Sequence, residues 1–414
     1  MTAEVAILNR HGLALAADSA VTVGEERVWT YTNKIFSLGP HNDIAIMIYG
    51  NGDFAGFPWE TVIKAFKRTL NKERFKTVSD CASRFFNFLT DKQWADDVQS
   101  PLVVYSILIK ELSEINNTID YKTKKEFRQK LSEVVEFCLN DITTKAVAVP
   151  NVEKADFLTA FRKEIDDLRD EEFSEHIPKY LKDKLDDYIF EYFRRAECPT
   201  NYQSGIVICG FGVDENYPVA VEHIVDGRYE DNVRFWEGRS ADLNKDRYKT
   251  GEILPFAQSD MSALFMEGIS APYLNYFFKM FEGILEKKTA EVMRVFTGTS
   301  AEKKVERRIQ KRVDNEIRKT IAADFDKFRM GTFVNPLMRN VQSLPREEMA
   351  AMAEALVELT SLRRKVDSVV QSVGGPVDVL LISKADGLVW IKRKHYFERE
   401  KNGEFFTRKA LLEG

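Results

Sequence analysis

The chain has 414 residues, a length typical of two to three domains. It is long enough to bury a large hydrophobic core without disulfides or structural metals. The composition, with 44% hydrophobic and 30% charged residues, is ordinary for a globular protein. The net charge of −5 argues against a protein that binds nucleic acid mainly through a basic surface. Four cysteines without CxxC spacing and five scattered histidines argue against a disulfide framework or a metal site. No apolar run approaches the roughly 20 residues that span a bilayer, and the start lacks a signal peptide, so we expect a cytoplasmic protein without a membrane partner.

The predicted elements alternate between strands and helices along the chain. Short alternating or continuous apolar runs bounded by turn residues predict strands, and apolar positions at helical spacing predict helices. The predicted strands span residues 4–8, 13–17, 34–38, 44–49, 205–210, 219–222, 253–258, 377–383 and 388–392. Helices are expected from 59 to 89, over nearly all of 92–200, and over 260–372. This order favours one α+β domain over residues 1–414, with helical insertions, rather than a string of separate domains.

The N-terminus carries the first sign of chemistry. Thr2 follows Met1, and a small second residue normally permits removal of the initiator methionine. A chain beginning at Thr2 would carry a hydroxyl nucleophile and a free α-amine on one residue. The α-amine has a pKa near 8, so a useful fraction is neutral at pH 7 and can accept the hydroxyl proton.

The segments AILNRHGLALAADSAVT, NKIFSL and IYGNGD resemble the proteasome β-subunit family, which are threonine N-terminal-nucleophile (Ntn) hydrolases. Asp18 lies sixteen residues after Thr2 and Lys34 thirty-two residues after it, which are the family's spacings. The resemblance implies that Lys34 lowers the pKa of the nucleophile, with Asp18 holding Lys34 charged and oriented. It also implies that the N–H of Gly50 stabilises the oxyanion. In isolation, Thr2 is an ordinary start residue; the joint spacing argues for the catalytic interpretation.

The resemblance continues more weakly downstream. ILPFAQSDMSALFMEG resembles the segment that carries a supporting serine, which would be Ser259. The implied fold is a four-layer αββα sandwich of two antiparallel sheets, with helical insertions at 92–203 and 283–344. The chain departs from the family before the closing strands, where Val370 and Val373 stand in place of an Asp and a Ser that support the N-terminal amine. Ser372, one position away, is an alternative support.

The family's substrate pocket implies a lining of Val21, Thr32, Phe36 and Ile48. That apolar lining would disfavour a bulky charged side chain, because the charge would be desolvated without a partner. The alternative is that these four are core residues. The charged segment EKKVERRIQKRVDNEIRK is typical of a solvated helix face, with a specific partner surface as the alternative.

We therefore expect hydrolysis of amide bonds in peptides or unfolded protein by an N-terminal threonine, with no cofactor and no metal. The expected partners are further copies of the chain in a ring or spiral, and an ATP-dependent unfoldase as a candidate. Three rivals stay open. These are a catalytically inactive assembly subunit, which the valines favour, an Ntn amidase acting on a small molecule, and a binding protein that works through the helical insertions.

Overall fold

The computed structural model describes residues 2–23, 27–29, 31–94, 99–173, 177–195, 203–229, 232–245, 248, 250–367, 374–395 and 397–407. The chain forms two compact units. The first comprises residues 1–30, 246–381 and 390–394, and the second comprises residues 31–245, 382–389 and 395–414. Among the described residues, no helix is both long enough and apolar enough to cross a membrane.

The first sheet has the strand order β12-β1-β2-β13-β14. Its strands are β1 (Ala3–Asn9), β2 (Gly12–Ala17), β12 (Gly251–Ala257), β13 (Asp378–Ser383) and β14 (Gly387–Lys392). β1 pairs antiparallel with β2 across a tight turn and with β12, about 250 residues further along the chain. Every side chain of β1 and β2 is buried, so β1 is a central strand rather than a solvent-facing edge.

Helix α12 (Arg346–Asp367) packs on β1 and β2, and its apolar face forms a core with them. This core includes Val5, Ile7, Ala353, Val357 and Val379. The first unit also contains two short helices, α8 (Asp260–Glu267) and α11 (Asn335–Val341). Asn9 links β1 to the end of α11, because its side-chain amide donates to the carbonyls of Val341 and Leu344, each at 2.9 Å.

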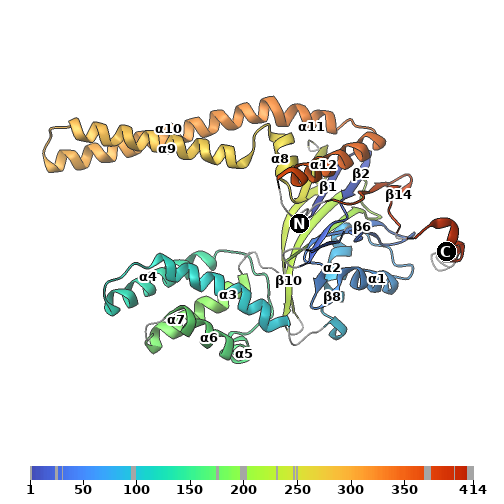
Figure 1. Cartoon of the computed structure of the whole chain (residues 1–414), viewed down its shortest axis with the longest axis horizontal. Coiled ribbons are helices and arrows are strands. Elements are labelled where there is room, and N and C mark those ends of the chain that lie inside the picture. The colour runs from blue at the N-terminus through green and yellow to red at the C-terminus, as the bar shows by residue number, and fades with distance from the viewer. Residues whose placement is uncertain are drawn as a thin grey trace. The chain divides into compact units, whose positions relative to one another are not determined.

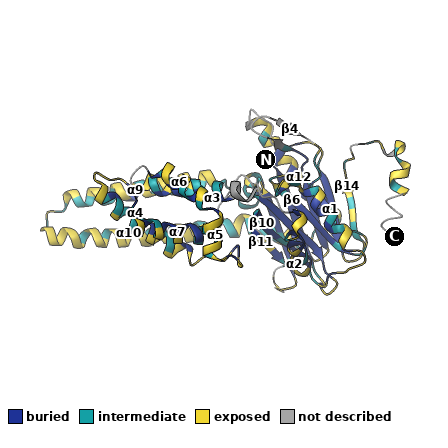
Figure 2. Cartoon of the chain, turned by 90° about the horizontal axis from the view of Figure 1, so that it is seen from below, coloured by how far each residue is buried: buried dark blue, intermediate teal, exposed yellow. Residues whose placement is uncertain are grey.

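Two long helices of the first unit, α9 (Ala271–Val295) and α10 (Ser300–Arg329), form an antiparallel hairpin (Figure 1). A capping box between Thr299 and Glu302 starts α10. Lys288 and Thr289 of α9 both donate to the carboxylate of Asp314 on α10. A π-helical turn (Met330–Val334) joins α10 to α11. Figure 2 shows that most of the hairpin surface is exposed.

The second sheet has the order β11-β10-β9-β6-β5 and lies entirely in the second unit. Helices α1 (Trp59–Thr69) and α2 (Val78–Leu89) form a large aromatic core with this sheet. The capping box of Thr77 and Asp80 starts α2. The strands of this sheet are β5 (Ile35–Ser37), β6 (Asp43–Gly50), β9 (Ser204–Phe211), β10 (Val219–Tyr229) and β11 (Asn232–Asp242). Two small two-stranded ribbons lie outside both sheets. One pairs β3 (Val21–Val23) with β4 (Arg27–Trp29), and the other pairs β7 (Asp53–Phe54) with β8 (Phe57–Pro58).

The helices between α2 and β9 have a hydrophobic core of their own. Phe127, Leu131, Phe157, Leu185 and Phe193 are among its most buried members. Tyr229, the last residue of β10, also belongs to this core. The helices are α3 (Gln99–Thr118), α4 (Lys124–Ile142), α5 (Lys154–Ala160), α6 (Arg162–Glu172) and α7 (Lys179–Arg195).

The structure confirms the expected α+β class, with two antiparallel sheets, helices packed on them, and helical insertions. The prediction missed five strands. The four short strands of the two ribbons were not predicted, and neither was the edge strand β11 at residues 232–242. Residues 237–240 of β11 are exposed. This part of the strand therefore lacks the alternation of apolar and polar residues that predicts a strand from sequence.

Candidate active site

Thr2 lies directly before β1 and is only 6% exposed. Its carbonyl accepts the backbone N–H of Gln258 at 2.9 Å, which extends the pairing of Ala3 with Ala257 by one step. The start of the described chain is therefore held in a sheet rather than in a loose tail. A side chain at this position has a fixed backbone, which is what a nucleophile at a chain terminus requires.

Asp18 follows β2 and is completely buried. Its Oδ1 accepts the N–H of Ala3 at 3.1 Å, and its Oδ2 accepts the N–H groups of Ala20 at 3.3 Å and Gly374 at 2.8 Å. Its own N–H donates to the carbonyl of Ala3 at 3.1 Å. The Asp18 carboxylate thus holds the residue that follows Thr2 and orients the start of β1.

The segment that precedes β13 completes this arrangement. The N–H of Ser19 donates to the Gly374 carbonyl at 3.1 Å, and the Ser19 hydroxyl donates to the Pro376 carbonyl. Gly374 has φ 151° and Gly375 has φ 78°, a backbone region that favours glycine. Val370, Ser372 and Val373 lie outside the described residues, so the departure from the family pattern at those positions stays a sequence observation.

Ser259 begins α8 and is half-buried. Its carbonyl accepts the N–H of Ala263 at 2.8 Å, but its side chain does not cap the helix. Arg364 of α12 donates to the side chain of Gln258 and forms a 3.1 Å ion pair with Asp260. Gln258 and Arg364, which the sequence analysis missed, thus hold the segment next to Thr2. No sequence signal marks them, because each is an ordinary polar residue at the end of an element.

Lys34 and Gly50 lie in the second unit, at one end of the neighbouring strands β5 and β6. Lys34 is 3% exposed, and its carbonyl accepts the N–H of Ile48 at 3.0 Å, two residues before Gly50. Gly50 has φ +82°, and a Cβ there would lie 2.4 Å from the carbonyl oxygen of Gln203. This position therefore requires glycine. The expected role of the Gly50 N–H as oxyanion donor stays a prediction.

In the first unit, Asp18 therefore contacts Ala3, the residue after Thr2, and Ser259 follows Gln258, which pairs with the Thr2 carbonyl. In the second unit, Lys34 pairs with Ile48, two residues before Gly50. The four predicted pocket residues are divided in the same way. Phe36 and Ile48 are 8% and 7% exposed and belong to the core formed with α1 and α2. Val21 and Thr32 are half-buried. Their role in a pocket stays a prediction.

No group of three or more His, Cys, Asp or Glu side chains in the described part of the chain could hold a metal ion. The buried thiols are also unsuited to nucleophilic chemistry, because burial raises the pKa of Cys81 and of Cys209 above the ordinary thiol value.

The fold and this site define an α+β protein in which a buried carboxylate fixes the start of the first strand beside a threonine. No family model and no curated protein matches the chain. Among solved structures, the chain is similar to an Anbu mutant from Hyphomicrobium sp. strain MC1, at 12% identity and a TM-score of 0.32, covering 99% of this chain and 97% of that one. It is also similar to Anbu, an ancestral beta-subunit, from Yersinia bercovieri (10%, TM-score 0.31, covering 99% and 97%) and to a helical assembly of the Anbu complex from Pseudomonas aeruginosa (9%, TM-score 0.33, covering 99% and 93%).

These findings correct one prediction. The sequence resemblance to the proteasome β-subunit family does not identify the chain as a member, because no family model matches it and the similar solved structures are Anbu proteins.

Proposed function

We propose that the chain is an amide hydrolase whose nucleophile is the hydroxyl of Thr2 after removal of Met1. The observation that carries the proposal is the anchoring of this terminus by a fully buried carboxylate. Asp18 accepts three backbone N–H groups, one of them from Ala3, and Gln258 donates to the carbonyl of Thr2. A buried carboxylate is costly unless it is hydrogen-bonded, and one of the groups that satisfies Asp18 is the N–H of the residue after Thr2, which supports a fixed position for Thr2.

In the proposed reaction, Thr2 Oγ attacks the amide carbonyl while the Thr2 α-amine takes the hydroxyl proton, directly or through water. The N–H of Gly50 donates to the developing oxyanion. The C–N bond breaks as the amine leaving group takes the proton, and an ester to Thr2 remains. Water then hydrolyses the ester and restores the hydroxyl. Lys34 favours the deprotonated nucleophile through its positive charge, and Ser259 supports the terminal amine.

The substrate class that we propose is peptide or unfolded protein. The rival of a small-molecule amidase would use the same Thr2 in an open site and would release product from short amides as readily as from peptides. The rival of an inactive assembly subunit would keep the fold without the chemistry. An ATP-dependent unfoldase stays a candidate partner for the peptidase alone.

Covalent labelling tests the reaction. An electrophilic β-lactone should add its mass to the wild-type chain, with peptide mapping placing the adduct on Thr2, and Thr2→Ala should take up none. Lys34→Met keeps most of the stem's bulk and removes the charge. We expect it to label at least about 100-fold more slowly, the scale of losing one preorganised electrostatic contact.

Thermal melting in parallel separates catalysis from folding. Equal labelling rates for Lys34→Met and the wild type would refute the role of Lys34. An absence of labelling in a folded wild-type protein would favour the inactive-subunit rival, because that rival predicts an intact fold with no reactive hydroxyl.

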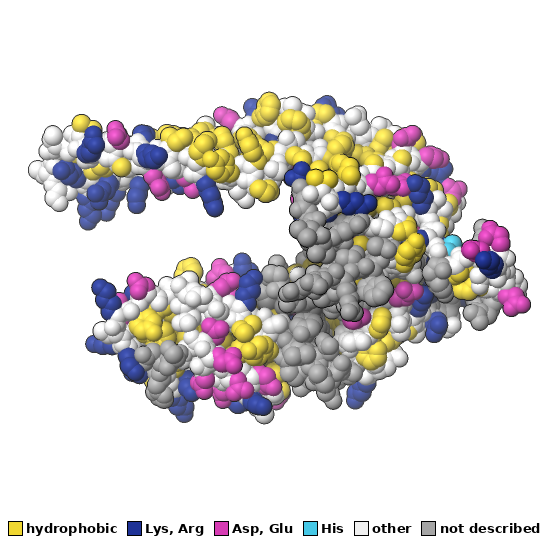
Figure 3. All heavy atoms as spheres, in the orientation of Figure 1, with side chains coloured by type: hydrophobic (Ala, Val, Ile, Leu, Met, Phe, Trp, Pro, Cys, Tyr) yellow, Lys and Arg dark blue, Asp and Glu magenta, His cyan; other side chains and the backbone are white. Residues whose placement is uncertain are grey.

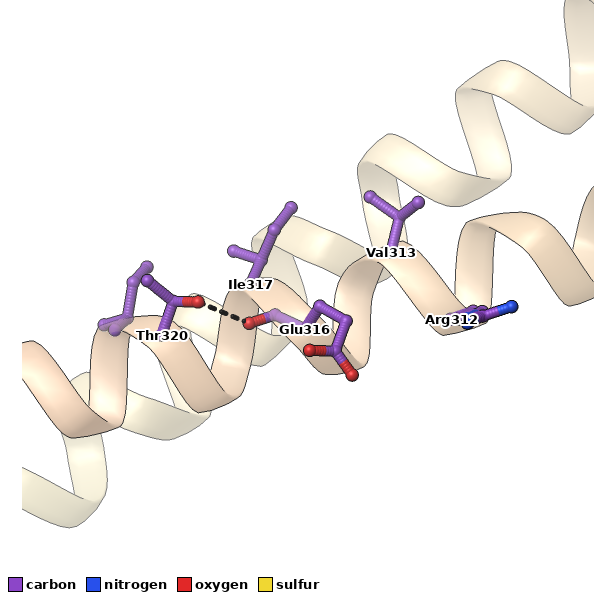
Figure 4. A pocket seen from close by; sticks show the side chains of 6 residues that line it. Arg312, Val313, Glu316, Ile317 and Thr320 are labelled. Atoms are coloured by element: carbon purple, nitrogen blue, oxygen red, sulfur yellow. Dashed lines mark hydrogen bonds between the residues drawn. The ribbon is translucent and has the colours of Figure 1, made fainter.

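We also propose that the chain self-associates through the α9–α10 hairpin. Each helix exposes apolar side chains at helical spacing, and Leu285 is the only apolar residue of the described hairpin helices that is fully buried. A 400 Å³ hollow on α10 is lined by Val313, Ile317 and Ile321 among others (Figure 4). Two helices with so little burial normally pack against further helices. The exposed large apolar residues of the described hairpin helices are Tyr273, Tyr276, Met280, Ile284, Val295, Val305, Ile309, Val313 and Phe328.

Charge favours a second copy of the hairpin, placed antiparallel, as the occupant. Residues 300–312 of α10 carry six basic and two acidic side chains, whereas residues 313–329 carry four of each. An antiparallel copy places each basic half against a balanced half, which avoids the like-charge repulsion of a parallel arrangement. Basic and apolar side chains both gather along this hairpin in Figure 3.

Native mass spectrometry tests this arrangement. We expect the wild type to form a homo-oligomer at micromolar concentration and Ile284→Glu to shift it to monomer, because a charge would be buried without a partner. Phe137→Glu, at a 75% exposed position of α4, is the matched control and should leave the oligomer intact. An Ile284→Glu protein that assembles normally would contradict the proposed interface. A monomeric wild type would contradict both that interface and the predicted ring or spiral, which needs a further contact between such pairs.

A further inference from the structure

A cavity of about 430 Å³ lies in the second unit, between α2 and the strands β10 and β11. Its walls include Phe86 and Asn87 from α2, His223 from β10, and Phe235 and Glu237 from β11. None of the residues proposed above for hydrolysis lines it. The volume falls within the range of about 300 to 1,000 Å³ that is usual for small-ligand sites.

Three rings form one wall of this cavity. Phe86 and Phe235 are stacked, with centroids 4.2 Å apart and an interplanar angle of 15°. The imidazole of His223 lies 4.7 Å from Phe86 and 5.9 Å from Phe235. Aromatic rings carry a negative face, so such a wall suits a flat apolar group and attracts positive charge.

The cavity is lined by an acidic side chain but by no basic one. Neither Lys nor Arg is among the residues that line the cavity. Burial lowers the pKa of His223 to about 4, although the nearby Glu237 opposes this, so the ring is neutral at pH 7. Glu237 is exposed and forms no ion pair with any residue in the described part of the chain. A positively charged ligand would therefore meet one available carboxylate, and an anion would meet no partner.

His223 gives a second, independent indication of a ligand. It is 94% buried by accessible area, and its Nδ1 makes no hydrogen bond to any residue that the structure describes. Buried polar nitrogens without a partner are uncommon in folded proteins and cost stability. A group that donates or accepts a hydrogen bond at this ring would remove that cost.

We propose that this cavity binds a small organic monocation with a flat apolar body, such as an aromatic amidinium or guanidinium. The flat body lies against the Phe86–Phe235 wall and the cationic group pairs with Glu237. The side-chain amides of Asn87 and Asn232, which also line the cavity, are placed to bind further polar groups of the ligand. The proposal is independent of the hydrolase chemistry, since its residues and its cavity are separate from Thr2 and Asp18.

Three probes of nearly the same shape test the proposal by isothermal titration calorimetry on the full chain. These are benzamidinium, neutral benzamide and anionic benzoate. We expect benzamidinium to bind at least about 10-fold more tightly than benzamide, and benzoate not to bind, because the three share the phenyl ring and differ in the charge and hydrogen-bonding groups of the head. Glu237→Gln should weaken benzamidinium at least about 10-fold and leave benzamide within a factor of about two.

Glu114→Gln is the matched control, since it removes an equally exposed carboxylate on α3 that does not line the cavity. It should leave all three probes unchanged. Phe235→Leu should weaken both benzamidinium and benzamide, with melting temperature confirming the fold. Benzoate binding as tight as that of benzamidinium, an unchanged affinity in Glu237→Gln, or no binding of benzamidinium at millimolar concentration would each overturn the proposal.

Discussion

At the residue scale, Asp18 shows how a spacing in the sequence becomes a structural contact. Its interval from Thr2 marked it as a candidate, and the structure places its carboxylate against the N–H of Ala3. Its other two donors could not be predicted, because Ala20 and Gly374 meet it only after β2 and the segment before β13 come together. The role of Asp18 in holding Lys34 stays a prediction, whereas its contact with the start of β1 is a feature of the structure.

Asp18→Asn tests this anchoring. One of the three N–H groups would face an amide NH₂ instead of an oxygen and would lose its acceptor. Leaving a buried donor unsatisfied costs about 1–3 kcal/mol, so we expect the free energy of unfolding in urea to fall by that amount. Ser19→Ala removes a hydroxyl bond of the same loop and should cost less, because a neutral bond contributes about 1 kcal/mol. If Asp18→Asn is as stable as the wild type, the carboxylate does not anchor the terminus.

At the element scale, the spacing of apolar residues and the positions of turn residues predicted most strands of both sheets and the positions of the helices. The hairpin of β1 and β2 is local, so its turn residues were sufficient. The pairing of β1 with β12 was not predictable, because it joins residues about 250 positions apart and depends on the helices between them. β11 was missed because its exposed residues 237–240 are polar or glycine, although Val233 and Phe235 contact the core of α1 and α2.

His223 on β10 provides a prediction for pH dependence. Its pKa is lowered from 6.5 to about 4 by burial, so the unfolded chain binds a proton more readily than the folded chain does. The stability due to this neutral ring is fully present above pH 6.5 and is lost as pH falls from 6.5 to 4. The loss amounts to about 3 kcal/mol.

His223→Phe removes the titrating group. We expect the difference in the free energy of unfolding between the wild type and this variant to change by about 3 kcal/mol from pH 7 to pH 4, in favour of the variant at low pH. Chemical denaturation at four or five pH values measures it. A difference that does not vary with pH would show that the pKa of His223 is ordinary in the folded state.

At the scale of the whole molecule, the chain divides its predicted chemistry between two units. Thr2, Asp18 and Ser259 belong to one, and Lys34 and Gly50 to the other. Amphipathic patterns predicted the helices, and the resemblance implied helical insertions at 92–203 and 283–344. Helices α3 to α7 have their own core, whereas the α9–α10 hairpin leaves apolar side chains exposed. That difference is invisible in the sequence, since both stretches are amphipathic. It explains why we assign self-association to the second insertion.

The central claim is that Thr2 becomes the first residue of the working protein, and intact mass spectrometry of the purified native chain tests it most directly. We predict a mass lower than that of the full sequence by one methionine residue, with the terminal peptide beginning at Thr2 and its amine unblocked. A folded, assembled protein that retains Met1 would contradict the account, because the amine that accepts the hydroxyl proton would then belong to a different residue.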